Sequence, residues 1–218
     1  FEKNELGMRP PQEALFRRAL SKGQGLILTT GPTGSGKTST LYAALKLLNQ
    51  ETVSIISIED PVEYRLPGVT QIQVNERSGL SFARGLRSLV RQDPDIVMIG
   101  EIRDRETAEI AIHASLTGHL VLSTLHTMSA AAAPLRLMDM GIPPYLLSAS
   151  LSLVMAQRLA PRLCPSCKRE MVLTEDFLTS HGLPLPLAGQ AAYEAEGCEA
   201  CRHRGFSGRT GVFEMIAI

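Results

Sequence analysis

The sequence predicts an α/β fold in which helices flank a mostly parallel central sheet and a small cysteine-containing subdomain follows. Apolar strand patterns alternate with helical patterns along residues 11–158, and a glycine-rich loop joins the first strand to a helix. Strands that are apolar throughout are typical of parallel sheets covered on both faces. After Pro161 the composition changes, and residues 164–211 hold all four cysteines and only one short helical pattern.

Hydrophobic spacing predicts the individual elements. Short apolar runs predict strands at 25–30, 53–60, 95–100 and 120–125, with an edge pair around 69–74. Helical spacing predicts helices over 11–22, from about 36 onward, and over 82–92, 105–118, 129–140 and 144–158. The helix at 105–118 has Asp104 as its expected N-cap and Gly118 at its end. The stretch YLLSASLSLVMA is too short for a bilayer core, so a buried helix is expected there.

Composition and charge describe an ordinary globular chain. Of its 218 residues, 44% are hydrophobic and 20% are charged, and 22 basic residues balance 22 acidic ones. Zero net charge argues against a generic nucleic-acid binder, because such proteins gain affinity from excess basic side chains. Both ends, Phe1 and Ile218, look cut from a longer protein. We expect a core at 1–161, a subdomain at 162–211 and a return to the core at 212–218.

The stretch GPTGSGKT, residues 31–38, matches the phosphate-binding pattern G-x-x-x-x-G-K-[ST] in full. A strand precedes it and a helix follows it, which is the context that the pattern requires. Backbone N–H groups would surround phosphate oxygens, Lys37 would reach the β- and γ-phosphates, and the Thr38 hydroxyl would coordinate Mg²⁺. The alternative is a glycine turn that matches by chance. The candidate ATP-binding residues are Gly31, Pro32, Thr33, Gly34, Ser35, Gly36, Lys37, Thr38 and Ser39.

An acid follows the strand VMIG, within the stretch VMIGEIRD. Gly100 stands where P-loop enzymes usually place an aspartate that orders magnesium, and Glu101 comes next. Carboxylates at the carboxyl ends of parallel strands lie where ligands bind in such sheets. Glu101 would polarise the attacking water or hold a magnesium-bound water. The alternative is a solvated acid paired with Arg103.

A second acidic cluster and two histidines lie near other strand ends. SIEDPVEY contains Glu59, Asp60 and Glu63, which would be costly beside a triphosphate unless a metal or arginines balanced them. His126 ends a strand, where its side chain could sense the γ-phosphate, and His119 follows a helix end. His113 and His181 are interpreted as structural.

The cysteines form two pairs, CPSC and CEAC, separated by 30 residues. Four thiolates from paired C-x-x-C turns would form the closed tetrahedral site of a structural Zn²⁺. A redox dithiol and unpaired buried cysteines are the alternatives. The candidate zinc ligands are Cys164, Cys167, Cys198 and Cys201.

Together these stretches resemble the secretion and type IV pilus motor ATPases, in the branch that serves type II secretion and pilus assembly. The resemblance rests on GPTGSGKTSTLYAAL, IEDPVEY, RQDPDIVMIGEIRDRETAEIAIHASLTGHLVLSTLHT, AQRL and the cysteine pairs, and it covers nearly the whole chain. It implies a RecA-like motor that hydrolyses ATP. The full-length protein would be a homo-hexamer, cytoplasmic and peripheral on the bacterial inner membrane, where it meets platform and cytoplasmic-anchor proteins and no nucleic acid.

The same resemblance implies roles for particular residues. Lys37 and Thr38 fall in its Walker A motif, 59–63 in its Asp box, Glu101 in its Walker B motif, and His119 and His126 in its His box. Arg87 and Arg103 resemble arginines expected near the γ-phosphate, in some cases across a subunit interface. The stretch TMSAAAAPLRL departs from the usual Asn-Asp-Ala-Ala-Gly run after the His box. Family members also carry upstream domains, one of which helps to hold nucleotide.

Two other classes of protein combine similar motifs. A P-loop nucleotide kinase can carry a four-cysteine lid, although these cysteines follow the whole sheet pattern instead of interrupting it. A zinc-containing nucleic-acid motor is the second alternative, and the neutral net charge counts against it.

Overall fold

The computed structural model describes residues 6–218 and contains one large sheet. Its strands are β1 (Gly25–Thr30), β2 (Ile55–Glu59), β3 (Val69–Gln73), β4 (Ile96–Ile99), β5 (Leu120–Leu125), β6 (Leu151–Leu163) and β9 (Phe206–Ala217). The helices beside it are α1 (Pro10–Leu20), α2 (Lys37–Leu48), α3 (Phe82–Leu89), α4 (Arg105–Leu116), α5 (Ala132–Asp139) and α6 (Pro144–Ser150). Short 3₁₀ turns span Glu76–Ser78 and Val90–Gln92.

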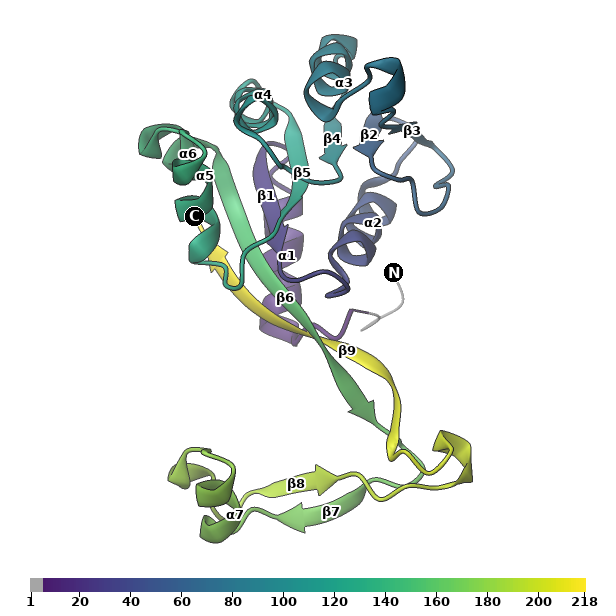
Figure 1. Ribbon diagram of the computed structural model, residues 1–218, viewed down its shortest axis with the longest axis vertical. Coiled ribbons are helices and arrows are strands. Elements are labelled where there is room, and N and C mark those ends of the chain that lie inside the picture. Colours follow the sequence, from purple (N-terminus) through teal and green to yellow (C-terminus); the bar gives the residue numbers. More distant parts are fainter. Residues whose placement is uncertain (1–5) are drawn as a thin grey trace. The chain divides into compact units, whose positions relative to one another are not determined.

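The strands lie in the order β3–β2–β4–β5–β1–β6–β9 (Figure 1). The pairs β2–β3, β2–β4, β4–β5, β1–β5 and β1–β6 are all parallel. This arrangement confirms the predicted α/β fold with a mostly parallel sheet. Because parallel strands end at the same edge, the loops that follow β1, β2, β4 and β5 lie together.

Helices cover both faces of the sheet, with α1 and α2 on one face and α3 to α6 on the other (Figure 1). Alternate strand residues enter the two cores, as the two-residue period of a strand requires. Ile27 packs with Tyr42 and Leu45 of α2, whereas Leu26 and Leu28 pack in the core beneath α3 to α6. Strands β1, β2, β4 and β5 are buried along their whole length, which explains their unbroken apolar sequences.

The helix termini follow local chemistry. The side chain of Asp104 accepts a hydrogen bond from the Thr107 N–H at 2.8 Å, so the predicted N-cap of α4 is confirmed. Gly118, just beyond α4, has a φ of 102°, a left-handed conformation that glycine adopts without steric cost.

The prediction of a helix over 144–158 is wrong in its second half. Helix α6 ends at Ser150, and β6 begins at Leu151 and pairs in parallel with β1. The residues Leu, Ala and Met of this stretch favour helix by intrinsic propensity, but the open edge of β1 offers backbone hydrogen bonds and a buried position. Tertiary pairing therefore overrides local preference here.

The chain divides into two compact units. One contains the residues up to Leu159 together with Gly211–Ile218, and the other is Ala160–Thr210. The predicted 1–161 core and the remark on Phe1 include residues 1–5, which lie outside the described residues. No helix within residues 6–218 is long and apolar enough to cross a membrane.

The second unit consists of short elements. It contains β7 (Arg169–Val172) and β8 (Ala191–Glu194), which pair antiparallel, and α7 (Glu175–Ser180), which confirms the predicted short helix. Its 3₁₀ turns span Leu185–Leu187 and Glu199–Cys201. Within the described residues 160–210, Leu178 is the one buried apolar side chain besides the cysteines. The apolar core of this unit is therefore very small.

Candidate functional site

The glycine loop connects β1 to α2 at the carboxyl edge of the sheet (Figure 1). Gly34 and Gly36 have φ values of 77° and 86°, and Gly36 is the N-cap of α2. The first N–H groups of a helix have no intrahelical acceptor, and the helix dipole adds positive potential there. The loop therefore presents backbone donors suited to an anion.

Side chains of the loop complete this donor set. Lys37 is buried, and its Nζ donates to the carbonyl oxygens of Gly31 at 2.9 Å and Pro32 at 3.1 Å. Ser35 is buried, and its hydroxyl has no hydrogen-bond partner among residues 6–218. Thr38 and Ser39 are exposed on the first turn of α2. An unpaired buried hydroxyl and an exposed threonine hydroxyl fit the binding of phosphate and Mg²⁺ at this loop.

Four charged side chains meet at the same edge, after β2, β4 and β5. Arg103 Nη2 lies 2.5 Å from Glu101 Oε1, and His126 Nε2 lies 3.3 Å from Glu101 Oε2. Arg103 Nη1 also lies 3.4 Å from Asp60 Oδ2. The structure thus brings Glu101, Arg103 and His126 together with Asp60.

Burial and charge shift the pKa values of this cluster. Burial lowers the pKa of Lys37, and the charge of Glu101 opposes that shift. Burial alone would raise the pKa of Glu101, but the hydrogen bond and charge of Arg103, with His126, hold it below the usual glutamate value. The Glu101 side chain is 18% exposed, so it is accessible. Because its pKa is lowered, it is ionised at neutral pH.

Glu59 lies apart from the Glu101–Arg103–His126 cluster. It is 2% exposed and accepts hydrogen bonds from the hydroxyls of Tyr42 and Ser57 and from the Gln71 amide. The bond from Ser57 is 2.6 Å and that from Gln71 is 3.0 Å. Glu59 shares the strand face of Ser57, which points to α2, so its carboxylate lies in this buried hydrogen-bond network.

Tyr42 connects this buried carboxylate to the acidic loop that follows β2. Its hydroxyl also accepts a hydrogen bond from the Glu63 N–H at 3.2 Å, and its ring meets that of Tyr64 edge-on at 4.7 Å. Burial, followed by the interaction with Glu59, raises the pKa of Tyr42 to about 12. The Glu63 side chain is exposed. Glu63 is therefore the acid of 59–63 that remains available beside Asp60.

Sequence reasoning did not assign site roles to Asp60, Tyr42 or Gln71. The alternation Ile55, Ser57, Glu59 was visible, and it would have placed Glu59 inward and Asp60 outward. Tyr42 lies three residues before Leu45 on α2 and shares the buried side of that helix.

Arg87 and His119 are also separated from Glu101 within this chain. Arg87, on α3, pairs with Glu106 of α4, and both side chains are 55% exposed. His119 precedes β5, and its Nδ1 lies 2.9 Å from the Ala114 carbonyl oxygen. Because β5 has six residues, His119 and His126 lie at opposite edges of the sheet, about 20 Å apart. Within one subunit, both residues therefore lie away from Glu101.

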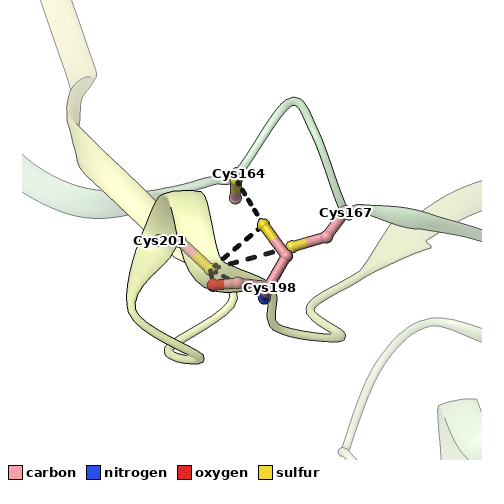
Figure 2. A group of neighbouring side chains, drawn as sticks. All are labelled: Cys164, Cys167, Cys198 and Cys201. Carbon is pink, nitrogen blue, oxygen red and sulfur yellow. Dashed lines mark hydrogen bonds between the residues drawn. The ribbon is translucent and has the colours of Figure 1, made fainter.

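The four cysteines cluster in the second unit (Figure 2). All four sulfur atoms lie within 4.8 Å of one another, and Cys164 and Cys201 are buried. The sulfur–sulfur distances are 4.0 Å for Cys164–Cys198, 3.8 Å for Cys167–Cys201 and 3.8 Å for Cys198–Cys201. A regular tetrahedron with zinc–sulfur bonds of about 2.3 Å has edges of about 3.8 Å. The sulfur positions therefore fit a four-coordinate metal.

Backbone donors around the sulfurs fit the same interpretation. The N–H groups of Cys198 and Gly205 each lie 3.2 Å from the Cys201 sulfur. These hydrogen bonds lower the pKa of Cys201 to about 6, so they favour the thiolate that binds metal. All four cysteines are free of disulfide bonds. This geometry argues against isolated cysteines.

Comparison with known proteins decides the family. The model of the type II/IV secretion system protein family matches residues 1–218. The chain belongs to this family. Members with similar sequences include type II secretion system protein E of Pseudomonas aeruginosa, which is 54% identical over 211 residues. That match covers 97% of this chain and 42% of the relative.

Other family members and solved structures agree. The type IV pilus assembly ATPase PilB of Myxococcus xanthus is 50% identical over 218 residues, covering 99% of this chain and 38% of the relative. The crystal structure of the pilus retraction motor PilT with bound ADP is 39% identical with a TM-score of 0.66. It covers 74% of this chain and 49% of that chain. The chain thus spans less than half the length of the curated relatives it matches.

Proposed function

We propose that the chain is the motor part of an ATPase that powers pseudopilus or pilus assembly in type II secretion or type IV pilus systems. One observation carries this proposal. The phosphate-binding loop and the Glu101–Arg103–His126 cluster lie at the same edge of the sheet, on consecutive neighbouring strands. Family membership supports it and favours it over a nucleotide kinase or a nucleic-acid motor.

Each part of the loop has a role in this proposal. The backbone N–H groups at the start of α2 bind the phosphates of ATP, together with Lys37. Lys37 Nζ moves from the carbonyl oxygens of Gly31 and Pro32 to the β- and γ-phosphates. The Thr38 hydroxyl and a carboxylate at the edge would hold Mg²⁺, which neutralises developing phosphate charge when bound. These roles also cover Pro32, Thr33 and Ser39, which are exposed around the loop.

Glu101 orients the attacking water. Arg103 holds the pKa of Glu101 below its usual value, so the carboxylate is a weak base. A weak base suits a loose phosphoryl-transfer transition state, in which little proton transfer accompanies attack. His126 positions the second carboxylate oxygen, and Arg103 would supply positive charge near the γ-phosphate.

The remaining assignments concern the whole protein. In this proposal the full-length protein is a homo-hexamer on the cytoplasmic face of the inner membrane and acts on a platform protein. Arg87 is exposed and distant from Glu101, which suits a role toward a neighbouring subunit. The residues up to Leu159 with Gly211–Ile218 act as the RecA-like core, and Ala160–Thr210 acts as a zinc-binding subdomain in which the metal is structural.

Replacing Lys37 tests this function. In the full-length protein, Lys37→Ala should abolish ATP binding and reduce hydrolysis by at least about a hundredfold, because the phosphates lose their buried cation. Lys46→Ala is the matched control, since Lys46 is exposed on the same helix and lies over the Tyr64 ring. Binding is measured by titration with a fluorescent ATP analogue, and hydrolysis by phosphate release. Unchanged hydrolysis in Lys37→Ala would overturn the proposal.

A further inference from the structure

The AQRL segment, residues 156–159, lies directly beside the glycine loop. In the parallel pairing of β1 with β6, Thr30 is opposite Ala156. The next residue along each strand is therefore Gly31 on β1 and Gln157 on β6, at the point where the loop begins. Gln157 is 3% exposed, although its side chain is polar.

Gln157 lies against both ends of the loop, with its side chain at one end and its backbone at the other. Its Oε1 accepts a hydrogen bond from the Thr40 hydroxyl on the first turn of α2 at 2.7 Å. Its Nε2 lies where a side chain at Gly36 would point, because a Cβ at Gly36 would lie only 2.8 Å away. At the other end of the loop, a Cβ at Gly31 would lie 2.4 Å from the Gln157 carbonyl oxygen. Gln157 thus contacts both ends of the loop and the helix that follows it.

The loop glycines differ in a way that Gln157 explains. Gly31, Gly34 and Gly36 all have positive φ, but a Cβ at Gly34 would meet nothing within 4 Å. Gly34 is therefore required for its backbone conformation alone. Gly31 and Gly36 also have no room for a side chain, because Gln157 occupies that space. The two ends of the loop are thus packed on one residue, Gly31 on the backbone carbonyl of Gln157 and Gly36 on its side-chain amide.

The other residues of the segment extend this contact. Leu159 shares the strand face of Gln157, and its Cδ2 would lie 3.6 Å from a Cβ at Gly36. Arg158 points to the opposite face, where its Nη2 donates to the Met128 carbonyl oxygen at 3.2 Å. Met128 follows His126 and Thr127, and the Thr127 N–H donates to Thr30 Oγ1 at 2.8 Å. The segment therefore contacts both the phosphate loop and the loop that carries His126.

We propose that Gln157 is a positioning residue for nucleotide binding, which holds the glycine loop at the spacing that phosphates require by way of Thr40, Gly31 and Gly36. This inference rests on the proposed function, because it assumes that the loop binds ATP. Gln157 does not contact the nucleotide. Its amide fixes the first turn of α2 relative to β1, so the backbone donors of the loop are already in place when phosphate arrives.

The experiment uses the full-length protein and four variants, which combine three substitutions. Gln157→Leu keeps the volume and removes the amide, and Thr40→Val keeps the shape and removes the hydroxyl. The double variant completes a thermodynamic cycle, and Gln24→Leu is the control, because Gln24 is an exposed glutamine before the opposite end of β1. The readouts are the Kd for MgATP and the Tm without nucleotide.

Each single variant at 157 or 40 should raise the Kd for MgATP by about tenfold, the size of one lost buried hydrogen bond. The Kd of the double variant should exceed that of the weaker-binding single variant by no more than about twofold, because both substitutions act through the same contact. Gln24→Leu should bind as the original protein does.

The opposing results are equally definite. If Gln157→Leu and Thr40→Val lower the Tm but leave the Kd unchanged, the pair only stabilises the fold and the inference is overturned. If their effects on Kd multiply in the double variant, Gln157 does not act through Thr40. If Gln157→Leu fails to fold, Thr40→Val alone decides the matter by the same Kd. Failure of the original protein to bind MgATP would instead overturn the proposed function.

Discussion

The four cysteines and the side chains around Glu101 form two dense polar clusters. The clusters differ in burial and in the partners of their polar groups. The four sulfurs of the second unit converge within 4.8 Å of one another, and two of the four cysteines are buried. At the carboxyl edge of the main sheet, Glu101 is paired on one side by Arg103 and on the other by His126. Both partners are 51% exposed, so this cluster is open to solvent.

The difference indicates what each cluster does. Four soft donors in a tetrahedron have no position left for a substrate, and the unit around them has almost no apolar core. Such an arrangement serves folding. The charged cluster follows the buried strands β4 and β5, and it keeps polar groups accessible. We therefore expect the stability of the second unit to depend on bound metal. We expect the chemical reaction to depend on the charged cluster of the first unit.

Removing the metal should give the largest effect and separate the two clusters. Chelation of zinc, or Cys198→Ser, should remove hydrogen-exchange protection across 160–210 while β1, β4 and β5 keep theirs, because metal binding supplies folding free energy to such small units. Ser166→Ala, in the same turn but with no ligand sulfur, is the matched control and should retain one zinc per chain. Full protection of 160–210 in metal-free protein would refute the comparison.

Disrupting the buried hydrogen-bond network around Glu59 in the first unit should have a moderate effect on stability. Tyr42→Phe removes the hydroxyl that donates to Glu59 and accepts from the Glu63 N–H, leaving a buried acid short of one partner. We expect the free energy of unfolding to fall by about 1–3 kcal/mol, measured by urea denaturation followed at the first unit. Tyr145→Phe, on a side chain that is 69% exposed, should change it far less. Equal changes in both variants would show that the network contributes nothing.

Acid sensitivity of the open cluster is the smallest effect. The pKa of Glu101 is below its usual value in the folded protein, so its favourable contribution is present above the unfolded-state pKa and is lost as pH falls through the folded-state pKa. Arg103→Ala removes the main lowering partner and leaves burial, which raises the pKa. The acid limb of the hydrolysis rate should therefore move to higher pH, and Arg105→Ala, whose side chain pairs with Glu109, should leave it in place. If the acid limb of the hydrolysis rate stayed in place in Arg103→Ala, Arg103 would not control the pKa of Glu101.

Much of the first unit could be predicted from sequence because its strands are apolar along their whole length. The glycine loop and Asp104 were also predictable, since each is a local pattern with a local cause. The region 144–158 was not, because a short apolar run is equally compatible with a buried helix and a buried strand. Residues from Leu151 onward form a strand because they pair with β1, which is far away in the sequence.

The spread of the expected site residues has a different origin. Motifs select Glu59 and His119, whereas strand geometry separates both from Glu101. Alternation along β2 points Glu59 to α2, and the start of β5 places His119 at the opposite edge from His126. A motif identifies which residues matter but does not tell which of them meet in one subunit.

The most direct test of the central claim is Glu101→Gln in the full-length protein, compared for MgATP binding and for phosphate release. The substitution keeps shape and hydrogen-bonding reach but removes the charge that orients water. We predict an unchanged Kd and a hydrolysis rate lowered by at least about a hundredfold. Full hydrolysis in Glu101→Gln, together with its loss in Glu63→Gln, would contradict the account and move the chemistry to the acidic loop after β2.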